Sequence, residues 1–284
     1  MAQIILIHGA WQGSWVWADV VPRLNEAGHS CHAVDLPGSA PDIADSAHVT
    51  FRDQIEYLED LIAEIGEPVV VVAHSGGGLA ASQIAENLPD RVVGIVYVAG
   101  IMLPDGTRFA EIVDSCKAAE PSSTGVWPRL EHLEGMSVMP EAAAIETFFH
   151  DGAPDAAARA AARLTPQSDT ARDASADITA DRFGSVPRIY IEALKDRSVV
   201  PFVQRRMQEL VPGAEVRSID TGHAPLVTDA ALLSEMLVEA VSDLEAGRPL
   251  RASAGPPRKS CGRGCPLSGS PGWDRSFPSC RVPR

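Results

Sequence analysis

The chain has 284 residues, of which 45% are hydrophobic and 22% charged, and its mean hydropathy is near zero. These values describe a globular protein with a sizeable core and exclude a chain that is disordered or collagen-like throughout. No run approaches the roughly 20 apolar residues needed to cross a bilayer, so we expect no membrane span. Because the first candidate strand begins at Gln3, no room is left for a cleavable secretion signal, and we expect a cytoplasmic protein.

The formal net charge of −14 is unevenly distributed along the chain. Residues 248–284 contain seven Arg, one Lys and one Asp, so they carry +7 and residues 1–247 carry −21. An acidic body repels phosphate backbones, so we expect no nucleic-acid partner. The basic segment is rich in Gly, Ser and Pro and has no apolar periodicity, which predicts disorder. Its Cys261 and Cys265 form a C-x3-C pair, but no second pair follows, so we predict no metal site.

Short β-rich runs alternate with longer amphipathic segments over most of the chain. The pattern predicts six strands, at 3–8, 30–34, 68–73, 92–98, 188–193 and 216–219. It predicts five long helices, at 15–27, 51–65, 79–87, 201–210 and 230–245. Strands that alternate with helices indicate an α/β fold with a mostly parallel six-stranded sheet and helices on both faces.

Residues 105–186 interrupt this alternation. They are rich in Ala, Pro, Asp and Ser, with a helical fragment at 141–150 and no convincing strand. Because the sheet pattern continues on both sides, we predict that residues 1–104 and 187–247 form one core. Residues 105–186 are then expected to be a helical cap inserted into it.

The decisive motif is Ala-His-Ser-Gly-Gly at 73–77, where a strongly β-biased run ends and a helix begins. A serine on such a sharp strand-to-helix turn is held in strained backbone geometry with its hydroxyl exposed. Ala73 and Gly77, two positions either side, are small, as a tight turn requires. We therefore expect Ser75 to be a nucleophile, with the following helix N-terminus favouring a developing oxyanion.

A second interpretation of the same turn is a dinucleotide fingerprint, because residues 76–81 fit G-x-G-x-x-A. That motif needs an acidic residue at the end of the next strand, where residues 98–100 are Val-Ala-Gly. No Gly-Lys-Ser/Thr sequence for a phosphate loop is present either. We therefore expect no nucleotide and no other cofactor.

A nucleophilic serine needs a base and a carboxylate that orients the base. His223 lies in the turn after the last expected strand, and the turns at the carboxyl ends of parallel strands meet at one edge of the sheet. Asp196 follows the fifth expected strand and completes the chain order Ser75, Asp196, His223. Asp105 is an alternative carboxylate from another loop, whereas Asp220 is too close to His223 in sequence to reach back.

A developing oxyanion needs two backbone N–H donors. One is the amide of the residue after the nucleophile, Gly76. The other is expected from the turn after the first strand, where Ala10 is the best candidate and Gly9 supplies backbone freedom. A structural role for the tight turn at 8–9 is compatible with this expectation.

Five motifs occur in an order that resembles the α/β-hydrolase superfamily: HGAWQGSWVW, DLPG, AHSGGG, DRSVVP and GHAP. The similarity covers about residues 3–245 and is greatest to the group of plant methylesterases, hydroxynitrile lyases and bacterial pyrethroid-type carboxylesterases. The resemblance implies the α/β-hydrolase fold with a cap over the pocket. It also implies five site residues: the nucleophile Ser75, the base His223, the acid Asp196, and the oxyanion-hole residues Ala10 and Gly76.

Departures from the family pattern disfavour some of its chemistries. Hydroxynitrile lyases of this type carry a lysine directly after the catalytic histidine, where this chain has Ala224, and a threonine where it has Gly9. Haloalkane dehalogenases and epoxide hydrolases use an aspartate as the nucleophile, which Ser75 argues against.

We therefore predict a cofactor-independent hydrolase that cleaves a small, mostly apolar carboxylic ester through an acyl-enzyme. A ligand-binding or non-hydrolytic protein on the same fold, and a lactone or C–C bond hydrolase, stay open as alternatives. The expected partner is the small-molecule substrate, with no nucleic acid and no membrane, and a homodimer is compatible with the sequence. Candidate pocket residues, each alternatively a packing residue, are Trp11, Met102, Leu103, Trp127, Phe148 and Phe149.

Overall fold

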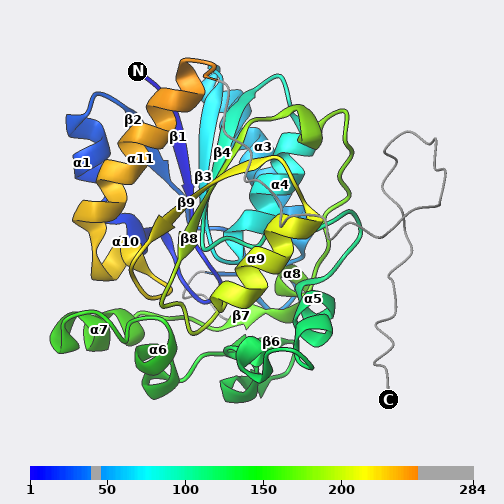
Figure 1. Ribbon diagram of the computed structural model, residues 1–284, viewed down its shortest axis with the longest axis vertical. Helices are drawn as coiled ribbons and strands as arrows, with labels where there is room; N and C mark the ends of the chain where they lie inside the picture. The colour runs from blue at the N-terminus through cyan, green and yellow to red at the C-terminus, as the bar shows by residue number, and fades with distance from the viewer. Residues whose placement is uncertain (40–45, 249–284) are drawn as a thin grey trace, which may run out of the picture. The chain divides into compact units, whose positions relative to one another are not determined.

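The computed structural model describes residues 1–39 and 46–248. At its centre is a six-stranded, all-parallel sheet in the order β2-β1-β3-β4-β8-β9 (Figure 1). The strands are β1 (Gln3–Ile7), β2 (Ser30–Ala33), β3 (Val69–His74), β4 (Val92–Val98), β8 (Arg188–Ala193) and β9 (Ala214–Ile219). The predicted six-stranded parallel sheet is confirmed.

The strands β1, β3 and β4 are apolar along most of their length because both faces of the sheet are covered. Successive side chains of a strand point to opposite faces, so each strand contributes to two cores. Ile5 of β1 and its partner Val71 of β3 enter one core cluster, whereas the neighbouring pair Ile4 and Val70 enters the other. A continuous apolar run is therefore the expected signature of a strand at this position.

Helices cover both faces of this sheet (Figure 1). One layer contains α3 (Phe51–Ile65), α4 (Gly77–Asn87) and α9 (Pro201–Leu210). The other contains α1 (Val21–Glu26), α10 (Pro225–Thr228) and α11 (Ala230–Glu245). The long helix α3 begins at a capping box formed by Thr50 and Asp53 and ends at Gly66, whose φ is +75°.

The prediction of one helix at 15–27 is wrong. A short 3-10 turn, η1 (Ser14–Trp17), comes first, and α1 begins only at Val21. The reason is Pro22, which lacks a backbone N–H and is tolerated only in the first turn of a helix.

Residues 105–186 contain α5 (Phe109–Cys116), α6 (Glu141–Thr147), α7 (Pro154–Ala161) and α8 (Asp169–Arg172), with 3-10 turns η2 (Pro121–Thr124), η3 (Trp127–Arg129) and η4 (Phe183–Ser185). They also contain a small antiparallel sheet of β5 (Glu131–Leu133), β6 (Met136–Val138) and β7 (Gln167–Ser168). The prediction that this segment contains no strand is therefore wrong. Strands of two or three residues are too short to show a period-two pattern, and β7 pairs with a strand far away in sequence.

The helices of this segment lie beyond the carboxyl ends of the parallel strands (Figure 1). The predicted limits of the cap, residues 105 and 186, stay a prediction. The described residues all belong to one compact unit, so no boundary separates the cap from the core. The predictions for 249–284, including the one for Cys261 and Cys265, lie outside the described residues. Within residues 1–39 and 46–248, no helix has both the length and the hydrophobicity to cross a membrane.

Candidate active site

Ser75 lies on the sharp turn between β3 and α4, with a φ of +48°. Positive φ is strained for residues other than glycine, and the described residues contain only two further cases, Trp11 at +61° and Ala99 at +44°. These three residues follow β1, β3 and β4. The backbone strain is therefore concentrated at the carboxyl edge of the sheet.

Three side chains from three different strand ends meet at this edge. His223 Nε2 lies 3.0 Å from Ser75 Oγ, and His223 Nδ1 lies 2.7 Å from Asp196 Oδ2. A carboxylate only accepts hydrogen bonds, so Nδ1 carries the imidazole proton and donates to Asp196. Nε2 is then left to accept from the Ser75 hydroxyl. All three residues are buried, with 8% of Ser75, 1% of His223 and 4% of Asp196 exposed.

The Asp196 carboxylate is held by further hydrogen bonds. Its Oδ1 accepts from the backbone N–H groups of Ser198 at 2.7 Å and Val199 at 2.9 Å. Its Oδ2 also accepts from Gln204 Nε2 at 3.2 Å. Gln204 was not predicted from the sequence, because it has no motif around it and is recognisable only as a buried polar side chain on α9. These donors hold the carboxylate in place and aim it at the imidazole.

The two alternative carboxylates have other partners. Asp105 accepts from the backbone N–H of Ile178 at 3.0 Å, and Asp220 pairs with Lys195 at 2.8 Å on the surface. Neither has a recorded contact with His223. The structure therefore brings Asp196, rather than either alternative, to the histidine.

The backbones of Ala10 and Gly76 lie next to each other beside the serine. A Cβ placed on Gly76 would lie 3.4 Å from the Ala10 nitrogen. Neither amide is recorded as donating to another described residue, so both N–H groups are available to a ligand. The loop that carries Ala10 is held by Gln12, whose Oε1 accepts from the Gly9 N–H at 3.1 Å and lies 3.0 Å from His74 Nδ1.

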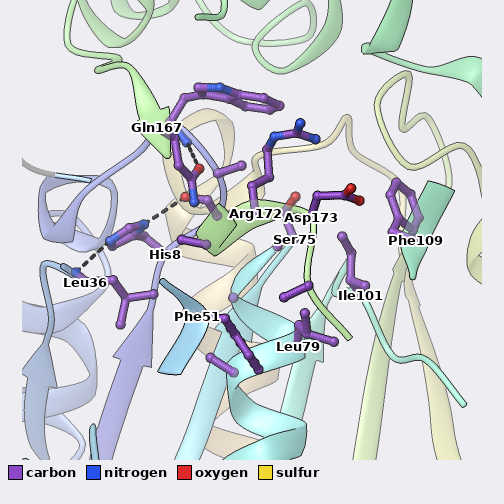
Figure 2. Close-up of a pocket in the computed structure, with 18 of the residues that line it drawn as sticks. His8, Leu36, Phe51, Ser75, Leu79, Ile101, Phe109, Gln167, Arg172 and Asp173 are labelled. Carbon is purple, nitrogen blue, oxygen red and sulfur yellow. Dashed lines mark hydrogen bonds between the residues drawn. The ribbon is translucent and has the colours of Figure 1, made fainter. Parts of the chain in front are cut away.

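A pocket with about 840 Å³ of empty space, including its mouth, opens beside Ser75 (Figure 2). Three of the predicted pocket residues, Trp11, Leu103 and Trp127, line it. Most of the remaining wall was not predicted from the sequence, because it is assembled from several loops and helices. The missed lining residues with large side chains include His8, Leu36, Phe51, Gln54, Leu79, Ile101, Phe109, Gln167 and Arg172.

Met102, Phe148 and Phe149 do not line the pocket, so their assignment to it is corrected. Met102 and Phe149 are 0% exposed and belong to the two core clusters on opposite sides of the sheet. The ring of Phe148 lies 5.1 Å from that of His223 and stacks at 6.1 Å on Trp11. Phe148 thus packs against the histidine and supports its position. Within the described residues, no group of three or more His, Cys, Asp or Glu is placed to hold a metal ion.

Comparison with known proteins identifies the family. The model of the alpha/beta hydrolase family matches residues 4–235. The chain belongs to this family. Methylesterase 7 of Arabidopsis thaliana is 30% identical over 247 residues, covering 84% of this chain and 95% of the relative. A pyrethroid hydrolase of Sphingobium wenxiniae is 29% identical over 254 residues, covering 86% of this chain and 87% of the relative.

Solved structures agree with this assignment. A crystal structure of a pyrethroid hydrolase matches with a TM-score of 0.73 and 26% identity, covering 85% of this chain and 98% of the other. The family model and the relatives together identify the protein as an α/β-hydrolase of the esterase type. The predicted family and enzyme class are thereby confirmed.

Glycines make the tight turn of this α/β-hydrolase possible. A Cβ on Gly77 would lie 2.5 Å from the His8 carbonyl oxygen, which agrees with the small residue expected there. A Cβ on Gly78 would lie 2.6 Å from the carbonyl oxygen and 2.7 Å from the nitrogen of Ile101. The close approach of Gly78 to Ile101 could not be predicted from the sequence, because Ile101 lies in the loop after β4.

We expect Gly78→Ala to destabilise the enzyme by about 1–3 kcal/mol, because backbone atoms of Ile101 cannot move aside. Helix propensity alone predicts the opposite sign, since Ala is favoured over Gly in a helix. Urea unfolding measures the difference. The control is Gly184→Ala, where a Cβ would have an ordinary contact of 3.5 Å with Thr179. A Gly78→Ala variant as stable as wild type would contradict the close approach.

Two further histidines are buried beside the serine. The His8 ring donates from Nδ1 to the Gly9 carbonyl at 2.8 Å and accepts at Nε2 from the Leu36 N–H at 3.1 Å, so it is neutral. His74 Nε2 lies 2.9 Å from the His223 carbonyl oxygen. Burial lowers the pKa of both imidazoles below the ordinary value of 6.5, and that of His74 well below it.

The free energy of unfolding is therefore expected to fall as the pH drops below about 6.5. In the unfolded chain His8 and His74 take up protons there, whereas in the folded enzyme they stay neutral, so acid favours the unfolded state. The slope approaches about 1.4 kcal/mol per pH unit for each histidine. Urea unfolding at pH 7.5 and 5.5 measures the effect. Equal free energies at the two pH values would show that these histidines do not resist protonation.

Proposed function

We propose that this α/β-hydrolase cleaves small, mostly apolar carboxylic esters through a covalent acyl-enzyme on Ser75. The observation that carries the proposal is the hydrogen-bonded series from Asp196 through His223 to Ser75, with distances of 2.7 and 3.0 Å, beside a largely apolar pocket. The names of the relatives, methylesterase and pyrethroid hydrolase, support an ester as the substrate.

In the first half of the reaction, Ser75 Oγ attacks the ester carbonyl carbon while its proton passes to His223 Nε2. The carbonyl oxygen becomes an oxyanion, and the N–H groups of Ala10 and Gly76 donate to it. Asp196 stabilises the imidazolium that forms. The C–O bond then breaks, the alcohol leaves with the proton from His223, and the acyl group stays on Ser75.

In the second half, a water molecule replaces the alcohol. His223 takes one proton from the water as its oxygen attacks the acyl carbon, and the same two amides hold the second oxyanion. The bond to Ser75 Oγ breaks, and Oγ recovers its proton from His223. The carboxylic acid leaves, and the enzyme returns to its starting state without a cofactor.

Rapid mixing with p-nitrophenyl acetate tests this two-step course. We expect a burst of p-nitrophenol close to one equivalent per active site when deacylation is slower than acylation, followed by steady turnover. Adding methanol at constant ester concentration should yield methyl acetate, because a shared acyl-enzyme partitions between methanol and water. The ratio of methyl acetate to acetate should be the same for p-nitrophenyl acetate and phenyl acetate. A ratio that differs between the two esters would contradict a common acyl-enzyme.

A further inference from the structure

The pocket beside Ser75 has a polar side that the proposed reaction does not use. Its polar residues come from the segment 105–186 and include Gln167 of β7, Arg172 of α8 and Asp173 directly after it. In Figure 2 these three and Ser75 lie in the upper half of the view, and Leu79 lies in the lower half. A substrate bound at Ser75 therefore faces both an apolar and a polar wall.

Arg172 has more hydrogen-bond donors than partners. A guanidinium has five N–H groups, and here Nη2 donates to Asp169 Oδ1 at 3.2 Å. In the part of the chain that the structure describes, no second acceptor is recorded for it, and its Nε is buried without a partner. Only 13% of the Arg172 side chain is exposed. Donors with so little access to water are costly unless a bound ligand accepts from them.

Gln167 adds a further donor from the same wall. Its Oε1 accepts from the Trp11 backbone N–H at 2.8 Å, which fixes the orientation of the amide. The Nε2 group is thereby left as a donor, with no acceptor recorded among residues 1–39 and 46–248. Arg172 and Gln167 thus offer donors to the pocket and call for an acceptor on the substrate, whereas the Asp173 carboxylate pairs with Arg108.

The charges around Arg172 are already balanced. Arg172 pairs with Asp169, and Asp173 pairs with Arg108 at 3.5 Å. A carboxylate on the substrate would therefore bring an uncompensated negative charge into a largely apolar pocket, which is unfavourable. A neutral oxygen, such as that of a ketone, accepts the same hydrogen bonds without adding charge.

The guanidinium is also held in place. Its Cζ lies 4.6 Å from the ring centroid of Trp127, which lines the same pocket and stacks in turn on Phe109 at 6.5 Å. Such a cation–π contact limits the freedom of a long side chain before a ligand arrives. Less conformational entropy is then lost on binding.

We infer that the preferred esters carry a second, neutral acceptor oxygen, and that Arg172 binds this oxygen while Ser75 attacks the ester carbonyl. The inference rests on the proposed ester hydrolysis and narrows its substrate class. Arg172 acts here as a specificity-determining residue, and takes no part in proton transfer.

Three methyl esters of matched size test the inference. Methyl 5-oxohexanoate has a ketone, methyl 5-methylhexanoate has a methyl branch in place of the ketone oxygen, and monomethyl glutarate has a carboxylate. We expect wild-type kcat/KM for the keto ester to exceed that for the branched ester about tenfold or more, mainly through a lower KM, with the anionic ester the poorest substrate. In Arg172→Met the ratio of keto to branched ester should fall towards one.

The matched control is Arg163→Met. Arg163 stacks on Trp15 with the same Cζ-to-centroid distance of 4.6 Å, but neither residue lines the pocket, so the wild-type ratio should be kept. Three outcomes would overturn the inference: no keto preference in wild type, the same preference in Arg172→Met, or a preference for the anionic ester. Failure of the proposed function is separate, because it would appear as hydrolysis of all three esters by Ser75→Ala.

Discussion

Ser75→Ala is expected to lower kcat for ester hydrolysis by at least about a thousandfold, because removing a triad nucleophile leaves only the binding and oxyanion contributions. The Ser75 hydroxyl oxygen lies 3.0 Å from His223 Nε2. Neither His223 nor Asp196 can replace it as the nucleophile. Steady-state hydrolysis of p-nitrophenyl acetate by the purified variant measures the loss. Alanine fits the turn sterically, so the melting temperature should change little.

The control for this variant is Ser82→Ala. Ser82 lies on α4, the helix that follows the turn of Ser75, and is 0% exposed, but its hydroxyl lies 2.8 Å from Tyr97 Oη, away from the imidazole. Its loss should affect stability more than turnover. A Ser75→Ala variant that is folded and retains more than a tenth of wild-type kcat would remove Ser75 from the reaction.

Asp196→Asn is expected to lower kcat by about a thousandfold to ten-thousandfold while leaving the fold intact. An Asn side chain can keep its oxygen on the N–H groups of Ser198 and Val199, so its NH2 group is turned towards His223 Nδ1. The imidazole then accepts at Nδ1 and carries its proton on Nε2. That tautomer cannot take the proton of Ser75.

The control for the acid is Asp220→Asn, which removes a carboxylate close to the histidine in sequence but paired with Lys195 on the surface. We expect wild-type kcat from it. The pair of variants is compared by steady-state kinetics across pH 6 to 9, since a wrong tautomer is not repaired by a change of pH in this range. Equal activity of both variants would show that Asp196 does not orient the base.

The convergence of Ser75, Asp196 and His223 was predictable where local sequence determines chain geometry. Ser75 lies between a β-biased run and a glycine-rich helix start, and the order Ser75, Asp196, His223 follows from turns at successive strand ends. Parallel strands bring those turns to one edge whatever the length of chain between them. The alternation of strands and helices is equally local, which is why the six-stranded sheet could be predicted.

Contacts between distant segments were not predictable in this way. The small sheet pairs β6 with β7, and strands this short leave no pattern to detect. Arg172 is one arginine in an irregular segment, and only its stacking on Trp127 and its place in the pocket wall make it distinctive. Phe148 is the opposite case. It was predicted to line the pocket because it is an apolar residue of this segment, but it packs against His223. The start of α1 could have been predicted, because Pro22 favours the first turn of a helix. The apolar spacing over 15–27 led instead to the prediction of one longer helix.

Covalent labelling tests the role of Ser75 most directly. The intact enzyme is treated with a fluorophosphonate, digested and analysed by mass spectrometry, with and without prior incubation with a competing ester. We expect one adduct per chain, on the peptide that contains Ser75, and labelling that is slowed by the ester and strongly slowed in His223→Ala. An active enzyme that takes up no label, or carries it on another residue while Ser75 stays unmodified, would contradict the account.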